Sequence, residues 1–181
     1  LICYPQGKTG AVTLPDTMTE IGDAAFSGCD ALETMRLPAS LTKISTRMFE
    51  DCRALKEITL PEGITSIGNY AFEGCTNLKE VSLPYTIKTI DIFAFKDCIN
   101  LYDCDIPSNT TFIGYGAFEN CSSLVDIILP DGITSVMAYT FQNCENLEEL
   151  HLLGEVTMID RFALCHCNNL SKIVLLSSQA P

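Results

Sequence analysis

Few side chains in this 181-residue chain have the types and spacing that catalysis or metal binding requires. Asp103 and Asp105 form a close pair of carboxylates, as general acid–base chemistry would need. Cys165, His166 and Cys167 are the one cluster that combines metal-ligand side chains. The sequence contains no recognisable catalytic triad and no glycine-rich phosphate-binding motif. Each candidate therefore has to be judged by the structural element that carries it.

Those elements follow from a repeat of 23 residues that runs along the chain without insertion or deletion. One phenylalanine marks each unit, at Phe26, Phe49, Phe72, Phe95, Phe118 and Phe141. One cysteine follows three residues later, at Cys29, Cys52, Cys75, Cys98, Cys121, Cys144 and Cys167. A period between 20 and 50 residues is typical of stacked repeat architectures. We therefore expect about eight units that bury their apolar sides against one another, with the phenylalanines and cysteines as structural ladders in the core.

A single unit can be interpreted residue by residue. Leu78, Val81 and Leu83 follow the L-x-x-L-x-L pattern of a leucine-rich repeat and predict a short strand, which Pro84 ends. Ala71-Phe72 predicts the start of a helical or 3₁₀ turn on the return side. The expected fold class is α/β: a right-handed leucine-rich-repeat solenoid, with a parallel sheet on one face and short helical or 3₁₀ turns opposite.

The residues from Leu60 to Leu78 read Leu-Pro-x-x-Ile-x-x-Ile-Gly-x-x-Ala-Phe-x-x-Cys-x-x-Leu. This pattern resembles the BspA-like family, also called the Treponema pallidum type of leucine-rich repeat, and the resemblance extends from about Leu14 to Leu175. It implies a surface or secreted protein of a bacterium or protozoan that acts in adhesion or host contact, and it implies no catalytic residues. We expect one solenoid domain over residues 1–181, with a partial N-terminal element at 1–13, regular repeats at 14–175 and an array end at 176–181.

One feature of other leucine-rich repeats is missing. No asparagine ladder follows the third leucine, so the backbone groups of that bend must have other partners. The residues at that position are Ser40, Gly63, Thr86, Asn109, Gly132 and Glu155.

The repeat register argues against chemistry at the candidate residues. Cys167 belongs to the cysteine column, which leaves Cys165 and His166 as a poor ligand set, so no metal site is expected. Neighbouring cysteines of the column would lie about 5 Å apart with parallel side chains, whereas a disulfide needs Cβ atoms that converge to about 3.5–4.5 Å. We therefore expect buried, reduced thiols. Asp103 and Asp105 fall on the exposed strand face, where solvated surface charge is the simpler interpretation, so we expect no enzyme and no cofactor.

An acidic column is the main candidate for binding. The outward strand position holds Thr34, Glu57, Glu80, Asp103, Asp126, Glu149 and Lys172. In one interpretation, duplication of an ancestral repeat produced this column, and the column has no function. Alternatively, the column attracts a basic peptide or a divalent cation such as Ca²⁺, with Asp105 in the next outward column and Tyr102 as a neighbouring anchor.

Charge narrows the partner classes. Acidic residues outnumber basic residues 23 to 11, which gives a net charge of −12 and argues against nucleic acid or an anionic membrane. No apolar stretch approaches the roughly 18 residues of a membrane span, and no signal peptide follows Leu1. The resulting hypothesis is a non-catalytic binding module, with a protein or glycan partner at a cell surface. A structural spacer in a larger surface protein and an accessory domain of a multidomain enzyme are the alternatives.

Overall fold

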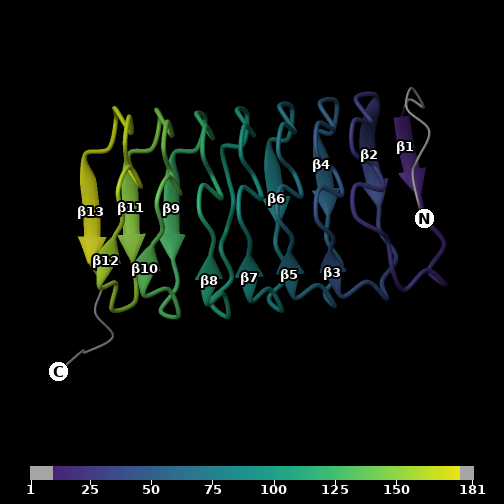
Figure 1. Cartoon of the computed structure of the whole chain (residues 1–181), viewed down its shortest axis with the longest axis horizontal. Helices are drawn as coiled ribbons and strands as arrows, with labels where there is room; N and C mark the ends of the chain where they lie inside the picture. The colour runs from purple at the N-terminus through teal and green to yellow at the C-terminus, as the bar shows by residue number, and fades with distance from the viewer. Residues whose placement is uncertain (1–9, 176–181) are drawn as a thin grey trace.

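The computed structural model describes residues 10–175 as a solenoid of about seven turns built from short parallel strands (Figure 1). Each turn except the one that carries Asp103 places one strand on the first face, and outward and inward side chains alternate along it as the repeat pattern predicts. In Asp126–Leu129, for example, Ile127 and Leu129 point into the core. The strands of this face are β1 (Gly10–Thr13), β2 (Leu32–Arg36), β4 (Glu57–Thr59), β6 (Glu80–Ser82), β9 (Asp126–Leu129), β11 (Glu149–Leu152) and β13 (Lys172–Leu175).

The expectation of helical or 3₁₀ turns on the opposite face was wrong. Residues 10–175 contain no helix, and the return side is a second row of two-residue parallel strands. These strands are β3 (Lys43–Ile44), β5 (Ser66–Ile67), β7 (Thr89–Ile90), β8 (Phe112–Ile113), β10 (Ser135–Val136) and β12 (Met158–Ile159). The solenoid therefore has a sheet on both faces.

The turns between the second and first faces fail to become helical because of two left-handed residues in each repeat. Tyr70 has φ of 59° and Gly74 has φ of 72°, and a left-handed residue cannot continue a right-handed helix. The amides of the turn point along the stack instead: Phe72 donates to the carbonyl of Ala94 at 2.8 Å, and Gly74 donates to the carbonyl of Lys96 at 2.9 Å. Amides that a helix would use internally bind one repeat to the next.

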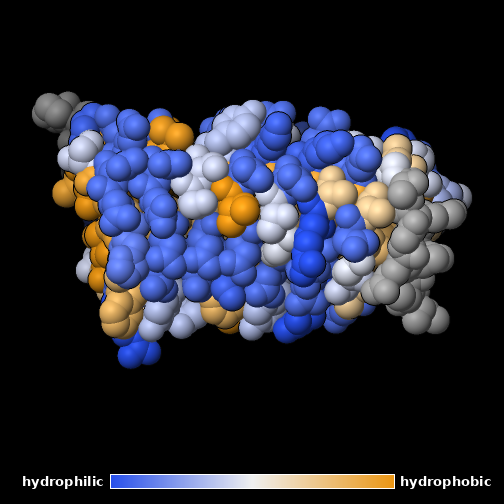
Figure 2. All heavy atoms as spheres, turned by 90° about the horizontal axis from the view of Figure 1, so that it is seen from above, coloured by the Kyte–Doolittle hydropathy of each residue, from blue (hydrophilic) through white to orange (hydrophobic). Residues whose placement is uncertain are grey.

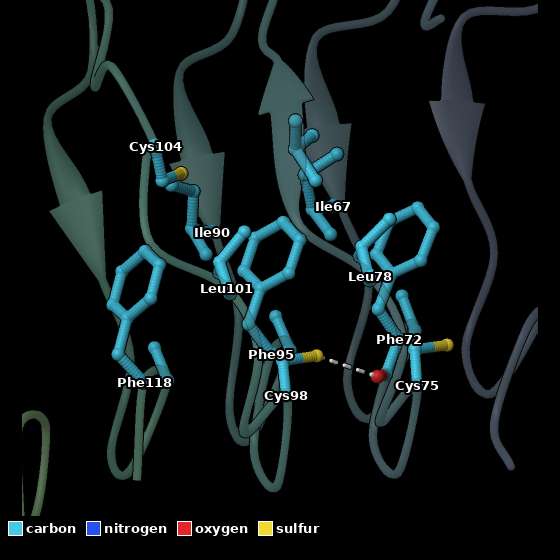
Figure 3. Close-up of a cluster of buried hydrophobic side chains, with 14 of the residues drawn as sticks. Ile67, Phe72, Cys75, Leu78, Ile90, Phe95, Cys98, Leu101, Cys104 and Phe118 are labelled. Atoms are coloured by element: carbon cyan, nitrogen blue, oxygen red, sulfur yellow. Dashed lines mark hydrogen bonds between the residues drawn. The ribbon is translucent and has the colours of Figure 1, made fainter. Parts of the chain in front are cut away.

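The core consists of columns of equivalent side chains (Figure 3). The six phenylalanines of the repeat are fully buried and stack with ring centroids 5.2 to 5.6 Å apart. From Cys52 onward, each cysteine of the column is a free thiol whose Sγ donates to the phenylalanine carbonyl of the preceding turn. Figure 3 shows one such bond, from Cys98 to Phe72, at 3.1 Å. The thiols thus fill volume and also satisfy a row of buried carbonyls.

In three repeats, the bend after the first-face strand position uses a hydroxyl or amide donor in place of an asparagine ladder, whereas Gly63 and Gly132 offer no side-chain donor at this position. Ser40 donates to the carbonyl of Met18 at 2.7 Å, and Thr86 donates to the carbonyl of Ile64 at 2.6 Å. Asn109 donates to a carbonyl of the preceding turn at 3.2 Å. Side chains of different types therefore perform the same task at this position.

The backbone ladder is interrupted at one step, which we call the open step, between the turns that carry Asp103 and Asp126. The sheet of β1, β2, β4 and β6 ends with an isolated bridge from Glu80 to Asp103, and a separate sheet of β9, β11 and β13 begins beyond it. Within residues 10–175, no strand pairing joins β8 to β10 either, and Figure 1 shows these two strands further apart than their neighbours. The turn edge stays bonded across the step, since Phe118 donates to Thr140 at 2.9 Å.

The turn before the open step departs from the repeat in its sequence. Cys104 and Thr110 occupy inward positions that hold branched apolar residues in the adjacent turns, and both are buried. Thr110 bonds the carbonyl of Ile87 at 3.4 Å, towards the preceding turn and away from the step. Asp103 and Asp105 are also poor strand formers. The departures from the repeat therefore coincide with the open step.

Candidate binding face

The acidic column lies on the exposed side of the first sheet. Register pairs Glu57 with Glu80, Glu80 with Asp103, and Asp126 with Glu149. All of these side chains are exposed except Glu149, which is partly buried. The open step separates Asp103 from Asp126, so the column continues across it without a backbone bond. We call Glu57, Glu80, Asp103, Asp105 and Asp126 the acidic strip.

The end of the column at Glu149 is neutralised. Lys172 lies 3.0 Å from the Glu149 carboxylate and His151 lies 2.9 Å from it. Hydrogen bonds from Lys172 and then His151 lower the pKa of Glu149 below its ordinary value. Glu149 therefore has its own cations and offers less to a partner than the strip does.

The strip itself has no such compensation. Within residues 10–175, no salt bridge reaches any of its five carboxylates. Partial burial, followed by repulsion from Asp105 and Glu80, raises the pKa of Asp103. The strip is a row of like charges whose mutual repulsion a cationic partner would relieve.

A shallow hollow of about 260 Å³ lies over the strip on the side that precedes the open step. Glu57, Glu80, Asp103 and Asp105 line it, with Ser82 among the polar side chains of its floor. Tyr102 directly precedes Asp103 in the sequence, and its hydroxyl donates to the carboxylate of Glu80 at 3.4 Å. Repulsion from Glu80 is the first cause that raises the pKa of this phenol. The predicted anchor therefore lies at the edge of the strip.

The other sequence candidates are not brought together into a site. Among residues 10–175, no three His, Cys, Asp or Glu side chains are grouped closely enough to hold a metal ion. Cys167 donates to the carbonyl of Phe141 at 3.1 Å as a member of the cysteine column, while His166 is exposed. Asp103 and Asp105 both lie at the exposed surface.

In the part of the chain that the structure describes, no helix has the length and apolar character needed to cross a membrane.

The sequence analysis missed the apolar side chains beside the strip. Ile99 and Val125 are exposed at the turn and strand start near Tyr102, and Ile128 is exposed beside Asp126. Seen from the edge at which the first-face strands begin, the surface is mostly hydrophilic, with a small apolar area near its middle (Figure 2). The signal was visible in the sequence, because each of these residues stands in a column that is otherwise mainly polar.

Comparisons with known proteins agree with this architecture. The sequence matches the family model described as BspA type leucine rich repeat region, in 6 copies, over residues 3–125 and 88–180. A leucine-rich repeat protein from Bacteroides ovatus is similar at 30% identity and a TM-score of 0.82, over 90% of this chain and 45% of that one. The Treponema pallidum leucine-rich repeat protein is similar at 28% identity and a TM-score of 0.70, over 95% of this chain and 72% of that one.

A third solved relative comes from Eubacterium ventriosum. Its leucine-rich repeat protein shares 25% identity with a TM-score of 0.81, over 99% of this chain and 46% of its own. The chain thus spans about half the length of the Bacteroides and Eubacterium relatives. No curated protein matches the chain.

Proposed function

Because the chain belongs to the BspA-type leucine-rich repeat family, we propose that it is a non-catalytic, protein-binding module of a cell-surface or secreted protein. Leucine-rich-repeat solenoids present extended surfaces that serve as protein-interaction scaffolds. The binding face in this proposal is the acidic strip, with Tyr102 at its edge and Glu149 at its neutralised end. The role is adhesion or another protein–protein contact outside the cell.

The observation that carries this proposal is the uncompensated charge of the strip. Like carboxylates on neighbouring strands repel one another by roughly 1 kcal/mol or less per pair in water, and by more where the face is desolvated by a partner. Lysine or arginine side chains of a partner would pair with these carboxylates, so that attraction between partner and strip replaces the repulsion within the strip. A basic peptide segment is favoured over Ca²⁺, because no three carboxylates are grouped to coordinate an ion in the described residues. It is favoured over a neutral glycan because the face is dominated by charge.

The test uses a fluorescent lysine-rich peptide and measures its binding by anisotropy. The strip variant combines Glu80→Gln, Asp103→Asn and Asp126→Asn. A matched control combines Glu20→Gln, Glu62→Gln and Asp131→Asn, three exposed carboxylates outside the strip. We expect the strip variant to bind at least about tenfold more weakly, the control to bind as the wild type does, and added salt to weaken wild-type binding. Equal binding by the strip variant and the wild type contradicts the proposal.

A further inference from the structure

Four exposed apolar side chains, which we call the apolar patch, flank the acidic strip on both sides of the open step. Their exposed fractions are 43% for Ile99, 48% for Tyr102, 37% for Val125 and 48% for Ile128. Ile99 and Tyr102 belong to the turn before the step, and Val125 and Ile128 belong to the turn after it. Tyr102 and Val125 therefore directly precede Asp103 and Asp126, the two strip residues on either side of the step, and Ile128 follows Asp126 on the same exposed face.

The patch departs from the repeat, whereas the acidic column conforms to it. Tyr102 and Val125 stand in a column that otherwise holds Glu33, Lys56, Lys79, Glu148 and Ser171. Ile128 stands between Asp105 and His151, and Ile99 stands between Thr76 and Ser122. Duplication of an ancestral unit explains a residue type that recurs, but it does not explain why four exposed apolar replacements gather in two adjacent turns. The patch therefore calls for a separate explanation.

Core stability does not supply that explanation. All four side chains are more than a third exposed, and the inward positions of the same turns are filled by buried residues such as Leu101, Leu124 and Ile127. Exposed apolar side chains gain free energy only when a partner covers them. A small apolar centre inside a polar rim is the usual anatomy of a protein interface, with tyrosine enriched among its energetically dominant residues.

We infer that the apolar patch is the centre of the binding face and accepts a partner segment in which large apolar side chains are flanked by lysine or arginine. This inference rests on the proposed function and defines its partner more closely. The apolar side chains of the segment cover Val125, Ile128 and the ring of Tyr102. Its cations meet Glu80, Asp103, Asp105 and Asp126. The hydrogen bond from Tyr102 to Glu80 keeps the polar end of the ring at the strip, so the ring meets both parts of the segment.

Charge decides between this occupant and a second copy of the chain. Each copy has a net charge of −12, and an isologous pair formed through this face would bring two acidic strips together. Such a contact is repulsive and leaves carboxylates without partners. A basic, apolar segment of another protein satisfies both the charge and the apolar surface.

The experiment compares two synthetic peptides that carry the same number of lysines and differ at two central residues, which are leucine in one and serine in the other. The patch variant combines Tyr102→Ser, Val125→Ser and Ile128→Thr, and thus introduces polar residue types found elsewhere in the same columns, Ser171 and Thr59. The control is Phe112→Ser, which removes a side chain of similar exposure, 41%, from the second face, where Ser66 and Ser135 hold the equivalent position. Urea midpoints verify that both variants are folded.

We expect wild-type protein to bind the leucine peptide at least about tenfold more tightly than the serine peptide. The patch variant should lose this preference and still bind both peptides weakly through its charges, while Phe112→Ser should keep it. Equal affinity of the wild type for both peptides, or an unchanged preference in the patch variant, overturns this inference and leaves the proposed function in place. Failure of the wild type to bind either peptide overturns both. Concentration-dependent dimers of the wild type that disappear in the patch variant would assign the patch to a second copy and overturn the inference.

Discussion

The cysteines show how one residue type serves two purposes at the scale of a single side chain. A thiol is small and apolar enough to pack beside the phenylalanine column, and it is also a weak donor for the carbonyl beneath it. Burial is the first cause that raises the pKa of Cys52 to about 12 and that of Cys167 to about 11. The reactive thiolate form is therefore suppressed along the column.

This leads to a prediction about thiol reactivity. At pH 8, a disulfide-type thiol reagent should react slowly with the column cysteines of the native protein and rapidly after denaturation in urea without a reductant. Cys165 is partly exposed and lies off the column, so it should react before Cys98 does. Cys165→Ser should remove that early phase, which absorbance against time would record. Rapid reaction of several column thiols in the native state would contradict the prediction. Cys3, another residue off the column, lies outside the described residues.

The carboxylates predict a dependence of stability on pH. The pKa of Asp103 in the folded protein is raised above its ordinary value of 3.8. At pH values between the ordinary and the raised pKa, this carboxyl therefore binds more protons in the folded state than in the unfolded state. The contribution of Asp103 to stability should therefore increase as the pH falls from neutral through this raised pKa. Asp103→Asn should reduce this increase.

Glu149→Gln provides the control for this measurement. The pKa of Glu149 is lowered from 4.5, so its own contribution is lost only at more acidic pH, and its removal should leave the change between pH 7 and 5 nearly unaltered. Urea titrations of the two variants at both pH values measure the difference. An equal change in both variants would rule out Asp103 as a source.

At the scale of the element, the turn of each repeat differs from what its residues suggest. The three-residue spacing of Phe72 and Cys75 fits a helical turn as well as the observed one, because both place the two side chains inward. What distinguishes them is the left-handed backbone at Tyr70 and Phe93, which is rare for bulky residues and which residue type does not indicate. The neighbouring turn supplies the carbonyls that stabilise this conformation, so the outcome depends on stacking as well as local preference.

The strands could be predicted more fully from the sequence. Because no insertion breaks the period, the register that pairs Glu57 with Glu80 follows from counting alone. The open step could not be predicted with equal ease. Cys104 and Thr110 are visible departures, but whether they break a backbone ladder depends on how the adjacent turn packs. The apolar patch was missed because the individual columns were interpreted for charge, and Val125 carries none.

The phenylalanine column predicts how stability is distributed among the elements. Phe95 stacks between Phe72 and Phe118, with centroids 5.2 and 5.4 Å away, so Phe95→Ala leaves a cavity between two rings and should cost about 3–5 kcal/mol. Phe141 stacks on Phe118 at 5.6 Å, and the next turn offers Leu164, which is partly buried. Phe141→Ala should therefore cost less. Urea titrations measure both losses, and a larger loss at Phe141 would contradict a core that is tightest in mid-stack.

At the scale of the whole molecule, the open step divides the solenoid into two bonded stacks. Residues 10–113 carry one continuous pair of sheets, and residues 126–175 carry another. The phenylalanine stack and the turn edge continue through the step, so the two parts share one core. A repeat protein is coupled through its nearest-neighbour interfaces, and this interface has lost both of its ladders while keeping its apolar contacts.

The resulting prediction concerns backbone exchange. In the other described turns from β5 to β12, the residue that follows Pro-x-x-Ile, or the four residues equivalent to it, donates its amide to the preceding turn. Lys88 donates to the carbonyl of Thr65 at 2.8 Å, and Thr157 donates to the carbonyl of Thr134 at 2.8 Å. Within residues 10–175, no such bond joins Thr134 to the turn before it. Hydrogen exchange at Thr134 should therefore be faster than at Lys88 and Thr157, because the amide of Thr134 lacks the hydrogen bond that protects theirs.

The contrast can be measured by exchange at single-amide resolution under native conditions, and it has an internal control. The amide of Phe118 crosses the same step at the turn edge with a 2.9 Å bond to Thr140, so it should be protected as strongly as Phe95, whose equivalent bond to Ala117 is 2.8 Å. Fast exchange at both Thr134 and Phe118 would mean that the whole interface opens. Slow exchange at both would mean that the ladder is closed in solution. Fast exchange at Thr134 alone requires a step that is open at the sheets and closed at the turn edge, as the structure shows it.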